Sequence, residues 1–270
     1  VTVGANNIFL GTCVGAASTD VSNSIVLGTC HTGKNQLGDD NVFLGKAISC
    51  KGCAYTGNKS IIIGSNIAMN CAVTGSRNIF LGRYIGVSLT SATRNIAIGS
   101  QAGNCLTTGQ RNIIAGDTAA SMGYITGGCN IVFGNCTGRC LADGPNNILI
   151  GMSAGKCLTS GGRNIAIGCG AMSTGTVTGS DNIAIGCKVA RCVTTGCYNI
   201  FFGKYAAAAG NITGCYNVVF GAHAGCCLST GGDNTVVGAC AAMRLTTGCK
   251  NVVIGGDSAK GVGGDFTGEY

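Results

Sequence analysis

Cysteine is the residue type in this sequence with the most potential chemistry, because 19 of the 270 residues are Cys. In four pairs of Cys, the two residues are 17 or 18 positions apart: Cys13 with Cys30, Cys140 with Cys157, Cys169 with Cys187, and Cys197 with Cys215. These thiols could form disulfides between neighbouring turns of a repeating chain, or they could fill small apolar slots, as buried Cys often does. Both interpretations stay open. The odd count leaves one sulfur unpaired or intermolecular if the others are oxidised.

The other metal-binding residue types do not form a site in the sequence. Cys50 and Cys53 make the one Cys-x-x-Cys motif, and no second pair follows at the spacing of a zinc site. His31 and His223 are the only histidines and lie far apart along the chain. We therefore expect no metal and no cofactor.

Catalytic residues are not grouped in the sequence either. The ten acidic residues are scattered, and the adjacent Asp39 and Asp40 have no matching base beside them. Gly168-Cys169-Gly170 has the form of the start of a dinucleotide-binding loop, but no third Gly stands at the required position. We expect that the chain is not an enzyme.

One pattern, Asn followed by three apolar residues and Gly, runs through the whole chain. It occurs 15 times with a mean period of about 17.4 residues, and Ser24 and Ser60 replace Asn in two copies. The Asn positions are Asn7, Asn41, Asn78, Asn95, Asn112, Asn130, Asn147, Asn164, Asn182, Asn199, Asn217, Asn234 and Asn251. Stacked amides can hydrogen-bond along such a column, so we expect a structural Asn ladder.

A second element lies between these copies and consists of an apolar residue, Thr or Ser, and Gly, as in Leu106–Gly109 and Leu245–Gly248. Each period therefore indicates a strand, a corner of small residues, a second strand and a Gly turn. The regular period predicts an all-β, parallel β-solenoid of about 15 coils that fills residues 1–270 as a single repeat domain. At about 4.8 Å per coil, it would form a rod roughly 70 Å long.

The middle residue after the Asn is apolar in all 15 copies, and the first and third are Ile, Leu, Val or Phe almost throughout, with Thr235 and Ala115 as exceptions, although a strand with one wet face should alternate. We expect one side to line the coil and the other to meet further chains, most simply three copies around one axis. The middle residues are assigned to the oligomer-facing side; they include Phe9, Phe43, Phe80 and Phe201. A broader coil that wraps both sides itself is the alternative.

Composition excludes several classes of protein. The 48 Gly do not recur every third residue and there is one Pro, which excludes collagen, and the apolar content excludes a disordered chain. No 18-residue apolar run exists, so membrane insertion is not expected. A net charge of +7, with Arg77, Arg94 and Arg111 one period apart, would suit an anionic host-surface glycan or form only a solvated ridge. Nucleic-acid binding is not expected, because basic residues are sparse.

The repeats at 95–111 and 164–181, NIAIGSQAGNCLTTGQR and NIAIGCGAMSTGTVTGSD, resemble the Asn-x-Ala-x-Gly repeats of phage and viral tail-fibre proteins. They are also similar to the head repeats of trimeric autotransporter adhesins, which form left-handed parallel β-rolls in trimers. The resemblance covers nearly the whole chain. It implies a non-enzymatic structural fibre, spike or adhesin on a virion or a cell surface, with attachment to a host or surface as its role.

Two other functions stay open at this stage. The chain starts and stops within a repeat, which suggests a fragment of a longer fibre or a self-polymerising extracellular filament whose open ends are occupied. A flat column of Thr before Gly could bind ice, but these Thr also have a local role in turns.

Overall fold

The computed structural model is made of short β-strands joined by tight turns, and it describes residues 4–12, 14, 21–29, 37–47, 49–50, 54–69 and 72–259. These residues contain strands and no helix, so the all-β class expected from the repeat is confirmed. The chain divides into two compact units, Val1–Phe133 and Gly134–Tyr270, and the same coil repeats in each of them.

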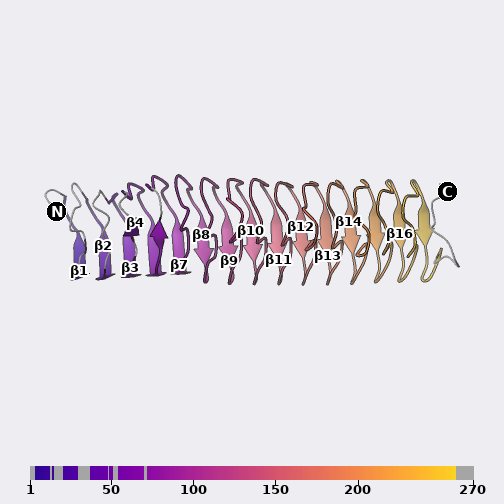
Figure 1. Cartoon of the computed structure of the whole chain (residues 1–270), viewed down its shortest axis with the longest axis horizontal. Coiled ribbons are helices and arrows are strands. Elements are labelled where there is room, and N and C mark those ends of the chain that lie inside the picture. The colour runs from indigo at the N-terminus through magenta and orange to yellow at the C-terminus, as the bar shows by residue number, and fades with distance from the viewer. Residues whose placement is uncertain are drawn as a thin grey trace. The chain divides into compact units, whose positions relative to one another are not determined.

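In the first unit, parallel strands stack in the order of the sequence (Figure 1). They are β1 (Ile8–Thr12), β2 (Ile25–Thr29), β3 (Val42–Lys46), β5 (Ile61–Ser65), β7 (Ile79–Arg83), β8 (Ile96–Ile98), β9 (Ile113–Ala115) and β10 (Ile131–Phe133). A separate small sheet pairs β4 (Ser49–Cys50) with β6 (Ala68–Met69), again in parallel.

The second unit repeats this arrangement. Its strands are β11 (Ile148–Ile150), β12 (Ile165–Ile167), β13 (Ile183–Ile185), β14 (Ile200–Phe202), β15 (Val218–Phe220), β16 (Thr235–Val237) and β17 (Val252–Ile254). Each strand pairs with the next at equivalent residues, so that Ile165 lies opposite Ile183 and Ala166 opposite Ala184. Because every coil stacks on its neighbour in this register, each unit is a parallel β-solenoid.

The middle residue of each strand points into the coil. Phe80 and Phe201 have no exposed surface, and Phe43 is buried as well. Their predicted oligomer-facing role is therefore wrong, and Phe9 is half-buried. The reason is the two-residue alternation of a strand, which places the middle residue on the same side as the buried Asn two positions earlier.

The rest of the core comes from the other sides of the coil. The apolar residues that precede the turn Thr are buried. Several of them pair with the equivalent residue of the next coil through a single backbone bridge, for example Leu106 with Ile125 and Val193 with Ile212. The predicted second strand is thus reduced to a single paired residue in these coils. A column of small residues, including Ala102, closes the interior. The coil is narrow, and its core is only a few side chains wide.

The Gly that closes each Asn motif is required by the backbone conformation. Gly203 follows β14 with φ of 126°, a conformation that L side chains rarely adopt. A Cβ placed there would lie 2.5 Å from the carbonyl oxygen of Gly221 on the next coil. Both the turn and the close stacking of the coils therefore depend on the absence of a side chain.

Candidate functional site

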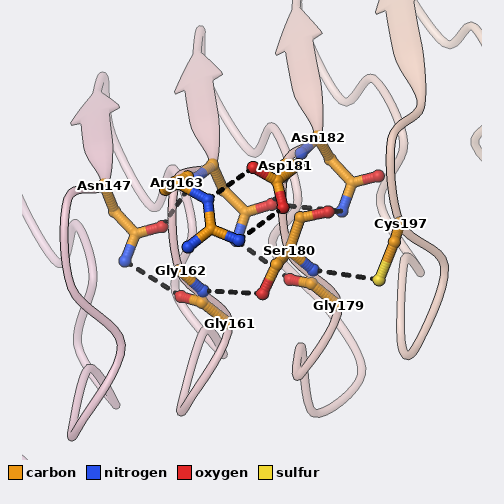
Figure 2. Close-up of polar contacts among 10 residues, drawn as sticks. Asn147, Gly161, Gly162, Arg163, Gly179, Ser180, Asp181, Asn182 and Cys197 are labelled. Carbon is orange, nitrogen blue, oxygen red and sulfur yellow. Dashed lines mark hydrogen bonds and ion pairs between the residues drawn. The ribbon is translucent and has the colours of Figure 1, made fainter.

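Within each unit, the Asn column forms an unbroken set of hydrogen bonds between coils, and Figure 2 shows part of it in the second unit. The Oδ1 atom of Asn147 accepts a hydrogen bond from the backbone N–H of Asn164 at 2.8 Å, and its Nδ2 donates to the Gly161 carbonyl at 2.9 Å. The same pattern recurs in both units, and the Asn side chains from Asn41 onward are fully buried. Asn7 lies at the start of the column and is half-buried. The ladder satisfies backbone groups that the narrow coil would otherwise leave unpaired.

Serine keeps half of this pattern. The backbone N–H of Ser60 donates to Asn41 Oδ1 at 2.9 Å, and Ser60 Oγ accepts from the Asn78 N–H at 3.2 Å. The Ser24 hydroxyl reaches the Gly38 carbonyl, the acceptor that an Asn amide would bond, but only at 3.4 Å. Ser is therefore a partial substitute for Asn at this position.

A second ladder, which the sequence reasoning missed, runs two residues before the Asn column. Here the side chain accepts a hydrogen bond from the equivalent backbone N–H of the preceding coil. Ser180 Oγ accepts from Gly162 N at 3.1 Å, and Cys197 Sγ accepts from Ser180 N at 3.3 Å (Figure 2). In the first unit, Asp39 Oδ1 accepts from Ser22 N at 2.8 Å. The recurrence of Ser, Asp, Asn and Cys in this column was the available signal.

The residue directly before each Asn has a left-handed backbone and carries much of the charge. Arg77, Arg94 and Arg111 are exposed on successive coils of the first unit, as the period predicts. In the second unit, Arg163 makes a two-pronged ion pair with Asp181, at 2.6 Å from Nε and 2.8 Å from the second guanidinium nitrogen (Figure 2). These hydrogen bonds lower the pKa of the Asp181 carboxyl and raise that of Arg163.

The cysteines whose pairing was predicted are free thiols in the structure. Cys140 with Cys157, Cys169 with Cys187, and Cys197 with Cys215 occupy equivalent positions on neighbouring coils. The Cys13–Cys30 pair lies outside the described residues. Disulfide formation on oxidation therefore stays a prediction.

The reduced thiols make hydrogen bonds between coils or are partly buried. Cys215 Sγ accepts a hydrogen bond from the Cys197 backbone N–H at 3.2 Å, as part of the second ladder. Burial is the main cause of a raised pKa at Cys157, and the neighbouring Cys140 adds to it. Burial also raises the pKa values of Cys105 and Cys226. These thiols pack as small, mostly neutral side chains.

The outer face of the sheet is apolar in both units. The first and third residues of each strand point outward. In the interior coils, the most exposed of these side chains have 36–59% of their surface exposed. They include Ile98, Ile113, Ile131 and Phe133 in the first unit, and Ile150, Phe220 and Val237 in the second. The remaining outward residues are half-buried by their neighbours on adjacent coils. We call these two columns the outer apolar columns.

Three stacked aromatic pairs lie on the neighbouring coils that contain β14 and β15. Phe202 and Phe220 stack within the outer apolar columns, with ring centroids 4.9 Å apart. Tyr198 and Tyr216 stack at 5.1 Å before the strands. Tyr205 and His223 stack at 5.1 Å beyond them. The sequence shows these aromatic residues, but only the coil register places each pair in contact.

No group of three or more His, Cys, Asp or Glu side chains is placed to hold a metal ion among the residues that the structure describes. His31 and Cys53 lie outside that set. In the described part of the chain, no helix has the length and apolar character needed to cross a membrane.

No family model matches this chain, and no curated protein or solved structure matches it at a significant level. The fold, the outer apolar columns and the stacked aromatic pairs are therefore the basis for a functional proposal.

Proposed function

We propose that the chain is a repeat segment of a structural fibre, spike or adhesin on a virion or cell surface, and that copies associate side by side. The proposal is supported by the resemblance of its repeats to tail-fibre and adhesin-head repeats. The observation that carries it is the pair of outer apolar columns, which expose large aliphatic and aromatic side chains on strand after strand.

The absence of charge in these columns favours association over solvation. In all 15 copies of the repeat, the first and third residues after the Asn are uncharged. A contiguous apolar patch of this kind is typical of an interaction surface, because monomeric proteins rarely leave one uncovered. Burying it would be driven by the hydrophobic effect at about 25 cal/mol per Å².

The regular spacing of the columns favours a second copy of the same chain as the partner. Apolar side chains recur once per coil, at the strand spacing of about 4.8 Å. A surface with the same spacing can match them coil by coil, and another copy of this solenoid has that spacing. We infer three copies around one axis, which brings each sheet face against the faces of the other two.

Analytical ultracentrifugation with native mass spectrometry tests the proposal. We expect wild type to sediment as a discrete trimer, and the variants Phe220→Lys and Val237→Lys to shift it toward the monomer. Thr247→Lys is the matched control, because it adds the same charge at an exposed turn residue away from the outer apolar columns. Circular dichroism of each variant checks that the β-solenoid is retained.

A folded wild-type chain that stays monomeric at micromolar concentration would overturn the proposal. Indefinite filaments in electron micrographs would replace the discrete fibre by the self-polymerising alternative.

A further inference from the structure

A cluster of cationic and aromatic side chains lies just beyond the ends of β13, β14 and β15. We call it the lysine–tyrosine cluster; it consists of Lys188, Lys204, Tyr205 and His223. The Lys188 ammonium donates a hydrogen bond to the Tyr205 hydroxyl at 3.3 Å and lies 5.5 Å from the ring centroid. The Lys204 ammonium lies 5.6 Å from the same centroid.

The Tyr205 side chain is held in place by these contacts. The imidazole of His223, on the next coil, stacks on its ring with an interplanar angle of 19°. Cation–π contacts with the two ammonium groups fix the ring further. A ligand would therefore meet donors that are already ordered, which reduces the entropy lost on binding.

The charge of the cluster is not balanced within the described residues. Lys188 and Lys204 are exposed and converge on one ring, although their like charges repel. The one ion pair found in the described part of the chain joins Arg163 to Asp181, so neither lysine has a carboxylate partner there. A local excess of positive charge attracts an anion.

We propose that the lysine–tyrosine cluster binds an acidic carbohydrate, through a sulfate or carboxylate group and the hydroxyls beside it. Ammonium groups only donate hydrogen bonds, and they suit the anionic group. The Tyr205 hydroxyl and the His223 ring can each donate and accept, and they suit sugar hydroxyls. This inference rests on the proposed attachment function, for which it names the ligand class.

The first unit contains a related pair at the equivalent position. Arg83, the last residue of β7, and Tyr84 come directly after Gly82, just as Lys204 and Tyr205 come directly after Gly203. The Arg83 guanidinium donates to the Tyr84 hydroxyl at 3.3 Å and lies 4.6 Å from the ring centroid. The hydrogen bond from Arg83 lowers the pKa of Tyr84. This second pair carries one cation instead of two, so we expect it to bind more weakly.

Stacking of nucleic-acid bases is less well supported than binding of a sugar. Base stacking needs an open aromatic face. One face of Tyr205 is stacked with His223, and ammonium groups lie against the ring as well. Single-stranded DNA therefore serves as a control ligand in the test.

Isothermal titration calorimetry of the full chain with a heparin-derived hexasaccharide tests the proposal. We expect the double variant Lys188→Ala/Lys204→Ala to weaken binding by about tenfold or more, because two charge-assisted contacts are lost. Tyr205→Phe keeps the ring and removes the hydroxyl, and we expect a smaller loss of about threefold. Lys250→Ala is the matched control: it removes one exposed positive charge elsewhere in the second unit and should change the affinity less than twofold.

Selectively modified hexasaccharides separate the two sources of anionic charge. Loss of binding on desulfation assigns the contact to sulfate, and loss on reduction of the carboxyl groups assigns it to carboxylate; either result supports the proposal. Absence of wild-type binding, equal loss in the Lys250 variant, or equally tight binding of a DNA strand of matched charge would overturn it. Sedimentation of the same samples reports association separately, since none of these residues belongs to the outer apolar columns.

Discussion

The side-chain oxygen of Asn164 accepts two hydrogen bonds from Asn182 on the next coil, from the backbone N–H at 3.0 Å and from Nδ2 at 3.1 Å. Asn182 does the same for Asn199, at 3.1 and 3.0 Å. Each buried amide therefore serves the coil on either side of it. A change at one Asn affects two coils.

Replacing Asn182 with Ala should destabilise the second unit by about 2–4 kcal/mol, because it leaves the Asn199 N–H and the Gly196 carbonyl without their side-chain partner. Asn182→Ser should cost about half as much, since a hydroxyl can still accept from the next N–H, as Ser60 does. Urea unfolding measures both, and amide exchange at Asn199 should be faster in the Ala variant. Equal stability of the two variants would contradict the ladder.

Replacing Gly203 with Ala should destabilise the fold by about 2–5 kcal/mol, because strain at positive φ adds to a backbone clash. The added Cβ would lie 2.5 Å from the Gly221 oxygen. Gly256→Ala is the control, since the nearest atom there is the Ala239 oxygen at 3.8 Å. Thermal unfolding compares the two, and a Gly203 variant as stable as its control would refute the close-stacking argument.

Mild oxidation should join Cys140 to Cys157, Cys169 to Cys187, and Cys197 to Cys215, because stacked strands place equivalent Cα atoms within disulfide range. The raised pKa of Cys157 leaves less thiolate near neutral pH, so closure of its pair should be faster as the pH rises. Peptide mapping without reductant identifies the bonds and tests Cys13–Cys30 as well. Cys105 is the internal control, because no Cys lies one period before or after it: residues 87–88 and 122–124 contain none. Random pairing that includes Cys105 would count against stacked partners.

The carboxyl of Asp181 should titrate below the usual range for Asp, and Arg163→Gln should return its pKa toward that range. Because the folded-state pKa is lowered, the ion pair stabilises the fold above the unfolded-state pKa and stops doing so as pH falls through the folded value. The effect on stability should be small and weakened by salt, since Arg163 is largely exposed. Carbon-13 NMR of the carboxyl follows both proteins, and an Asp181 pKa that does not respond to the variant would rule out this cause.

The repeat was predictable because its period is visible in every copy, and a regular period near 17 residues has few structural explanations other than stacked coils. The side of the strand that faces the core could also have been predicted from the sequence. A buried Asn column places the residue two positions later, such as Phe80 or Phe201, on the same side. Assigning the Phe residues to the outside was inconsistent with the expected ladder, and the alternation of the strand resolves it.

The lysine–tyrosine cluster could be predicted only in part from spacing. Lys188, Tyr205 and His223 are separated by 17 and 18 residues, so they share one column of the repeat, whereas Lys204 lies outside that column. The convergence of both lysines on the Tyr205 ring depends on side-chain directions at a turn with left-handed backbone at Lys188 and Tyr205. Those directions are a property of the folded turn.

The two ladders run in opposite senses, since Asn side chains accept from the coil that follows and the side chains two residues earlier accept from the coil that precedes. The Asn ladder therefore presents the same bonding groups at the start and end of each coil, whereas coils with Gly at the earlier position, such as Gly162 and Gly232, supply only the N–H donor of the second ladder. If one complete coil were removed, the coils on either side of it could still form the Asn hydrogen bonds with each other. Removal of only a few residues would shift the register and break both ladders. The chain can thus gain or lose length by duplication or deletion of whole coils, so that its reach can change in evolution while each remaining junction is preserved.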